Sequence, residues 1–154
     1  MFREMRRNRQ LLSEEESIAI LENCTSGVLA LSGDGGYPYA VPMSYVYDDG
    51  KLYFHSALSG HKIDAIRRNE LASFCVIAQD IVAPAEFTTY YRSVIAFGRI
   101  RIIDEPVEKR RTAKLLAAKY DPSNLGNLDK EMEKGFDRMC MIELEIEHLT
   151  GKGR

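Results

Sequence analysis

The stretch YRSVIAFGRIRII, residues 91–103, is the longest strand candidate in the chain, and it decides the fold class. Its residues alternate between two faces with the period-two pattern of a half-buried strand. One face carries Ser93, Ile95, Phe97, Arg99 and Arg101, and the other carries Val94, Ala96, Gly98, Ile100 and Ile102. Gly98 inside the strand predicts a bulge or a sharp bend. A long, bent strand of this kind favours a small barrel over a flat sheet.

Five further strand candidates surround this one, and most are joined by short turns. They are Val28–Leu31, Tyr39–Tyr47, Lys51–His55, Leu71–Ile77 and Met139–His148. Asp49-Gly50 between the second and third is a strong hairpin signal, whereas residues 79–89, with Pro84, read as a loop. Hairpin-joined strands predict a mainly β fold, an antiparallel β-barrel with peripheral helices, rather than a doubly wound parallel sheet.

The 154 residues are expected to form one domain around one core. An N-terminal arm (1–12) precedes a helix (13–26), which begins with the capping-box spacing of Ser13 and Glu16. The barrel core spans 28–103 and includes a crossover helix at 60–69. A helical segment (106–135) and a closing strand (139–148) follow, and Glu143, Glu145 and Glu147 give that strand an acidic, solvated or partner-facing side.

Composition excludes several classes of function. A formal charge of -2 offers no general attraction for nucleic acid or for an anionic membrane. No apolar run approaches the roughly 18 residues of a membrane span, and the basic N-terminus is followed by SEEES rather than by the apolar part of a signal peptide. Cys24, Cys75 and Cys140 are widely spaced, which favours reduced thiols and no metal site. We therefore expect a cytoplasmic protein that binds neither nucleic acid nor membrane.

The stretch FHSALSGHKIDAIRRN, residues 54–69, contains the main candidate for a binding site. A helix beginning after Gly60 would place His61 and Lys62 in its first turn, where the helix dipole disfavours cations. An anion such as phosphate would reverse that penalty, because free amides, a glycine, the hydroxyl of Ser56 or Ser59 and two basic side chains would surround it. The alternative is that both basic side chains simply point into solvent.

Neighbouring segments support a ligand at this position. His55 and Ser56 end the strand that feeds the helix, and Arg92 and Ser93 are expected to begin the long strand beside it. The segment Tyr39-Ala40-Val41-Pro42-Met43-Ser44 contains a proline that cannot donate to a ladder, which leaves exposed backbone groups. Such an edge could hold a planar heteroaromatic ring.

These ordered segments carry a resemblance to a known family. The runs GYPYAVPMSYVYDDGKLYFHSALSGHKIDAIRRN and FTTYYRSVIAFGRIRII, with the opening MRRNRQLLSEEE and the closing HLTGKGR, resemble pyridoxamine 5'-phosphate oxidase-related FMN-binding split-barrel proteins. The likeness covers nearly the whole chain and is strongest to the group similar to 5-nitroimidazole reductases. It implies a six-stranded antiparallel split barrel of Greek-key type, and homodimers with flavin at the subunit interface.

The resemblance also implies a set of cofactor-binding residues. The ring-side strand would be Tyr39, Ala40, Val41, Pro42, Met43 and Ser44, with its backbone near the ring nitrogens and O2/O4. The ribityl phosphate would be held by Phe54, His55, Ser56, His61 and Lys62, with a further contact from Ser93. His55 is the matching candidate for a catalytic histidine beside the flavin.

The chain departs from true pyridoxamine phosphate oxidases at three places. Tyr39 and Ser44 stand where those enzymes have an arginine and a lysine around the ring-side strand, and Gly60-His61-Lys62 stands in place of Ser-Arg-Lys. The C-terminal segment that carries their substrate arginine has no counterpart, so vitamin B6 oxidation is not expected. The resemblance instead implies an FMN-dependent oxidoreductase that takes hydride from NADH or NADPH and reduces a small nitroaromatic acceptor.

One alternative to the enzyme remains open from the sequence. The same fold could bind FMN, or haem, without turnover, for storage, sensing or delivery.

Four tyrosines at period two predict one packing face, of which Tyr39 alone is expected to contact flavin: Tyr37, Tyr39, Tyr45 and Tyr47. Arg67 and Arg68 end a helix, where positive charge is favourable, so they are expected to be structural.

Overall fold

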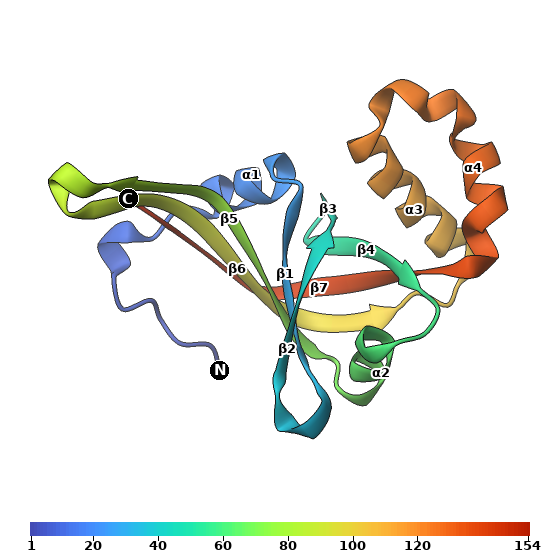
Figure 1. Ribbon diagram of the computed structural model, residues 1–154, viewed down its shortest axis with the longest axis horizontal. Helices are drawn as coiled ribbons and strands as arrows, with labels where there is room; N and C mark the ends of the chain where they lie inside the picture. Colours follow the sequence, from blue (N-terminus) through green and yellow to red (C-terminus); the bar gives the residue numbers. More distant parts are fainter.

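The computed structural model describes residues 1–154, the side chain of Leu125 excepted. Seven strands form one antiparallel sheet with the order β2-β1-β5-β6-β7-β4-β3 (Figure 1). Their bounds are β1 (Ser26–Ser32), β2 (Pro38–Ser44), β3 (Val46–Asp48), β4 (Lys51–Ala57), β5 (Leu71–Ala83), β6 (Thr88–Ile102) and β7 (Met139–Gly153). The mainly β, antiparallel fold is confirmed.

Four α-helices accompany the sheet: α1 (Glu14–Asn23), α2 (His61–Arg68), α3 (Pro106–Tyr120) and α4 (Leu128–Gly135). The capping box is present, since the Ser13 hydroxyl accepts from the Glu16 N–H at 3.1 Å and the Glu16 carboxylate accepts from the Ser13 N–H at 2.9 Å. The first helix ends at Asn23 rather than at residue 26. Among the residues described, no helix has the length and apolar character needed to cross a bilayer.

The expected count of six strands was wrong, because the segment 39–47 is two strands that break at Tyr45. The Tyr45 N–H donates to the Tyr120 hydroxyl at 3.1 Å, and its carbonyl accepts from Lys119 Nζ at 3.1 Å. These backbone groups are therefore bonded to α3 instead of to a neighbouring strand. The expected common tyrosine face was also wrong, since Tyr45 is fully buried while Tyr37 is 78% exposed.

The expected loop at 79–89 is instead the end of a long hairpin. β5 and β6 stay paired from Gln79 opposite Arg92 to Ala83 opposite Thr88, and only Pro84–Glu86 and Phe87 form the turn. Isoleucine, valine, threonine and tyrosine at these positions favour extended backbone. Arg92 and Ser93 consequently lie inside β6 rather than at its start, and the hairpin projects away from the barrel (Figure 1).

The bend at Gly98 is confirmed. The register between β6 and β7 shifts between Phe97 and Gly98, so that Glu147 has no directly paired partner on β6. A Cβ atom on Gly98 would overlap the carbonyl oxygen of Glu145, which explains why only glycine fits here.

Two apolar cores lie on the two sides of β4 and β7. The larger fills the barrel and includes Leu21 from α1, Ile63 from α2 and Phe54 from β4. The smaller is formed where α3 and α4 cover the outside of the sheet, around Met132 and Met141 (Figure 1). The helical segment therefore forms a second layer on one outer face of the barrel.

The acidic face expected for the closing strand needs one correction. Glu143 is 3% exposed, and its two carboxylate oxygens each accept a 3.1 Å hydrogen bond from Arg101. Glu145 and Glu147 are exposed as expected. Glu143 differs because it lies next to Tyr53 on the part of the sheet that α3 covers. The three cysteines are free thiols, and Cys140 is buried.

Candidate functional site

The barrel is open along one seam, which we define as the free edges of β2 and of residues 54–57 in β4. β2 ends the sheet, and pairs on one side only, with β1. β4 pairs with β7 along its length, but β3 covers its other edge only at residues 51–53. The backbone groups of both edges are thus available to a ligand. This agrees with the expectation that the Pro42-containing strand has an unpaired edge.

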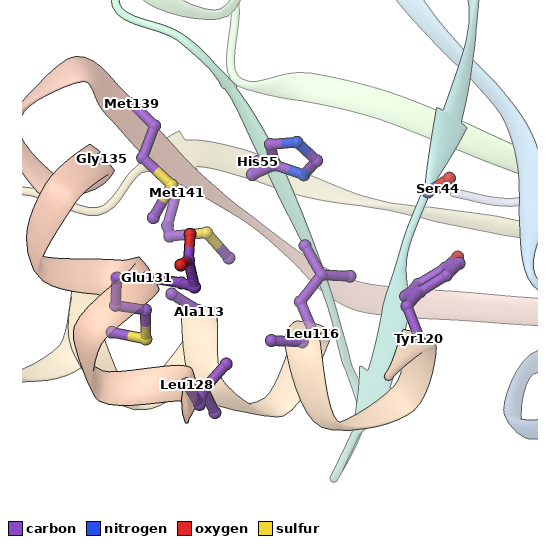
Figure 2. A pocket seen from close by; sticks show the side chains of 12 residues that line it. Ser44, His55, Ala113, Leu116, Tyr120, Leu128, Glu131, Gly135, Met139 and Met141 are labelled. Carbon is purple, nitrogen blue, oxygen red and sulfur yellow. The ribbon is translucent and has the colours of Figure 1, made fainter. Parts of the chain in front are cut away.

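Side chains connect the two sides of the seam at each end. At one end, the rings of Tyr39 and His61 stack with centroids 4.0 Å apart. At the other, Ser44 of β2 and His55 of β4 line the same cavity (Figure 2). A flat ring laid along β2 would therefore meet side chains from β4 and from the start of α2.

The start of α2 brings together a glycine, a lysine and a hydroxyl. Gly60 precedes the helix with φ of 132°, a conformation that side chains disfavour. Lys62 Nζ donates to the Ser56 hydroxyl at 3.5 Å, so the cation and the hydroxyl meet across the strand-to-helix turn. Lys62 has no carboxylate partner within the described part of the chain.

His61 is held differently from Lys62. Its Nε2 accepts a hydrogen bond from the main-chain N–H of Asp34 at 3.2 Å and lies 3.7 Å from the Asp34 carboxylate. The Asp34 carboxylate is ion-paired with Arg68 at 2.9 Å. His61 therefore joins the first turn of α2 to Tyr39 and to the β1–β2 loop, whereas Lys62 has only the Ser56 hydroxyl as a partner.

Burial decides which seam residues could contact a ligand through their side chains. Met43 and Phe54 point into the barrel core, so only their backbone can face the seam. Ala40, Pro42 and Ser44 are exposed on the outer side of β2, while Tyr39 and Val41 are half-buried. On β4, His55 is exposed and Ser56 is half-buried, and no hydrogen bond to the His55 side chain is found within the described residues.

A cavity of about 370 Å³ opens beside His55 (Figure 2). Two helices form its walls, through Ala113, Leu116, Ala117 and Tyr120 of α3 and Leu128, Glu131, Met132 and Gly135 of α4. Met139 and Met141 of β7 form its floor, and Ser44 and His55 stand where it meets the seam. Sequence reasoning missed this cavity, although the apolar spacing in α4 could have indicated that one side of that helix packs against the barrel.

Lys119 and Tyr120 fix the position of Ser44 from outside the seam. Lys119 Nζ donates to the carbonyls of Cys24 and Tyr45, at 2.5 and 3.1 Å, and burial lowers the pKa of its ammonium group. The Tyr120 hydroxyl donates to the carbonyl of Thr25. Burial also raises the pKa of the Tyr45 phenol, which donates to the Leu21 carbonyl at 2.7 Å. These bonds lock the turn that ends β2.

Ser93 is not brought to the seam within one chain. It lies opposite Lys152 of β7, eleven residues along that strand from Met141, the partner of His55, which is roughly 35 Å of extended chain. There it lines a separate cavity of about 450 Å³ with Phe2 and Arg3 of the N-terminal arm.

Comparisons with known proteins agree with this fold. A proposed 5-nitroimidazole antibiotic resistance protein from Bacteroides thetaiotaomicron has a TM-score of 0.74 at 20% identity, over 92% of this chain and 85% of that one. A FAD- and haem-binding protein from Mycobacterium smegmatis has a TM-score of 0.80 at 22% identity, covering 94% and 73%. A FAD-binding protein from Mesorhizobium loti has a TM-score of 0.64 at 25% identity, covering 94% and 96%.

The search of curated proteins found no match. The family described as pyridoxamine 5'-phosphate oxidase matches residues 13–153, from the helix cap of α1 to the end of β7. That range includes the seam, the start of α2 and the cavity under α3 and α4. The chain therefore belongs to the pyridoxamine 5'-phosphate oxidase family, and its fold is the split barrel of that family.

Proposed function

We propose that the protein is an FMN-binding oxidoreductase that takes hydride from NADH or NADPH and reduces small nitroaromatic acceptors. The observation that carries this proposal is the seam, which has an unpaired backbone edge on β2 and a lysine–hydroxyl pair, Lys62 with Ser56, at one end. A phosphate-bearing flat ring is the class of cofactor that fits both features.

In this arrangement the chain binds and orients the cofactor. Lys62, Ser56 and the first amides of α2 would hold the ribityl phosphate, with His61 and Phe54 supporting that end of the seam. The backbone of residues 39–44 would donate to and accept from the ring. Bound FMN would supply the hydride and electron transfer.

His55 is the one imidazole exposed where the seam meets the cavity. Its ring nitrogens can donate a hydrogen bond to an acceptor molecule, and can give or take a proton as charge develops there. Since Ser44 stands opposite with a hydroxyl, an acceptor at this point would be positioned by one group from each edge of the seam.

We further place the protein in the cytoplasm as a homodimer with two flavins at its interface. Reduced cysteines suit a reducing compartment. Ser93 lies too far along β6 to reach the flavin of its own chain, so its contact would be to the flavin of a second copy. Exposed apolar side chains on the β5–β6 hairpin, Ile77, Ile81, Val82 and Phe87, are surface that such a copy could bury.

A second candidate is a protein that binds FMN, or haem, without turnover. It is favoured because few side chains along the described seam could exchange a proton with a bound molecule, and His55 is the candidate catalytic group among them. The purified protein decides between the two. Released FMN, and bleaching of the bound flavin by NADH or NADPH without air, would support the oxidoreductase, whereas a flavin or haem spectrum that neither donor changes would support the binding protein.

A further inference from the structure

The cavity beside His55 is distinct from the seam in shape and chemistry. The seam is a backbone edge with a cation at one end, whereas the cavity is a hollow lined by side chains of two helices and by Met139 and Met141 of β7 (Figure 2). Its volume of about 370 Å³ lies near the lower end of the roughly 300–1,000 Å³ typical of small-molecule sites. It is large enough for a molecule of one or two rings.

The charges around the cavity select against anions. Its lining contains one carboxylate, Glu131, and no lysine or arginine. Lys134, which approaches Glu131 at 3.5 Å, is an exposed side chain outside the lining. An anion entering the cavity would lose its hydration without gaining a cationic partner, whereas an uncharged ring would lose little.

The methionine side chains allow the cavity to accommodate ligands of different shapes. Met132, Met139 and Met141 contribute flexible, polarisable thioethers, which favour contact with aromatic rings and fill irregular gaps. The hydroxyl of Ser44 and the imidazole of His55 are placed at the mouth, where they can orient a polar substituent.

We propose that this cavity, walled by α3 and α4, is the acceptor site and takes uncharged aromatic molecules while rejecting their carboxylate analogues. The proposal rests on the proposed function, because a ring seated there would be next to the end of the flavin edge at Ser44. It assigns the choice of acceptor to the helical segment rather than to the barrel strands.

Matched ligands test the charge preference. Binding of p-nitrotoluene and p-nitrobenzoate would be measured by equilibrium dialysis against the full-length protein, with and without FMN, at about pH 8, where imidazoles are neutral. We expect p-nitrotoluene to bind at least tenfold more tightly than p-nitrobenzoate in both states. Equal affinities, or no binding of p-nitrotoluene, would overturn the proposal.

Matched variants test the location. Gly135 lines the cavity, and a Cβ atom there would meet no atom within 4 Å, so Gly135→Leu fills the space without a backbone clash. Gly126 is equally open but is not part of the lining, so Gly126→Leu is the control. We expect at least a tenfold loss of p-nitrotoluene affinity in the first variant and less than a twofold change in the second. Ala117→Leu, on the opposite wall, repeats the test should the first variant fold poorly.

Failure of this inference can be told apart from failure of the proposed function. If Gly135→Leu weakens FMN and leaves p-nitrotoluene unaffected, the cavity holds part of the flavin, and the acceptor site is refuted while the flavoprotein stands. If the wild-type protein binds no FMN, the proposed function fails, and the measurements without FMN still decide whether the cavity takes uncharged rings.

Discussion

Replacing Lys62 by alanine is expected to weaken FMN binding and to leave riboflavin binding unchanged. Riboflavin has the same ring and ribityl chain but lacks the phosphate that Lys62 is proposed to hold. The variant therefore separates recognition of the phosphate from recognition of the ring.

The structure sets the expected size of this effect. Lys62 is half-buried, has only the Ser56 hydroxyl as a partner, and has no carboxylate to compete with a ligand within the described residues. A hydrogen bond to a charged group contributes about 1.5–3 kcal/mol. Since about 1.4 kcal/mol is a factor of ten, the dissociation constant for FMN should rise roughly 10- to 150-fold.

The assay is quenching of flavin fluorescence as protein without bound flavin is titrated into FMN or riboflavin. Lys130→Ala, which removes the same charge from an exposed position on α4, is the control and should leave both affinities unchanged. His61→Ala should weaken FMN binding less than Lys62→Ala, because the His61 ring is already bonded to Asp34 and Lys62 has no carboxylate partner. An unchanged FMN affinity in Lys62→Ala, or an equal loss for riboflavin, would refute the phosphate site.

Three further perturbations test the fold. Arg101→Met should lower the free energy of unfolding by about 3 kcal/mol, because it leaves the buried Glu143 carboxylate unpaired. Glu143→Gln should lower it less in the same urea titration. A larger loss for Glu143→Gln than for Arg101→Met would contradict the pairing. Gly98→Ala should cost about 3 kcal/mol or prevent folding, because its Cβ would overlap a carbonyl of β7, and a wild-type melting temperature would show that the bulge is absent. Hydrogen bonds from Ser13, first from its backbone and then from its side chain, lower the pKa of Glu16. The stability that this carboxylate contributes is therefore present above the ordinary carboxyl pKa and lost as pH falls through the lowered one. The difference in unfolding midpoint between the wild type and Glu16→Gln should shrink between about pH 7 and pH 3, and a constant difference would refute the capping role.

Local signals predicted local structure well. The capping box at Ser13, the glycine before α2, the Asp49-Gly50 turn and the bulge at Gly98 each depend on the chemistry of a few adjacent residues. The structure confirms all four. For the same reason the lysine–hydroxyl pair at the start of α2 could be anticipated, since Ser56 and Lys62 are only six positions apart, on either side of the turn from β4 to α2.

Contacts between distant residues could not be predicted in this way. The break at Tyr45 depends on Lys119 and Tyr120, about seventy-five positions later, and nothing in the alternating pattern of 39–47 indicates it. The burial of Glu143 likewise depends on how α3 packs over the sheet. The cavity forms only where five elements meet, namely β2, β4, α3, α4 and β7. Its residues, apart from Ser44 and His55, were therefore absent from the predicted site.

The hydrogen bonds from Lys119 and Tyr120 hold the C-terminal end of α3 against the end of β2, whereas the rest of α3 contributes side chains to the cavity. The residues between Pro106 and Ala118 could be exchanged among homologous chains to change the lining of the cavity, provided that Lys119 and Tyr120 keep their hydrogen bonds to the barrel. Without those two residues, the backbone of Tyr45 would lose its partners on α3, so that a change in the helical segment would also disturb the end of β2 beside the seam.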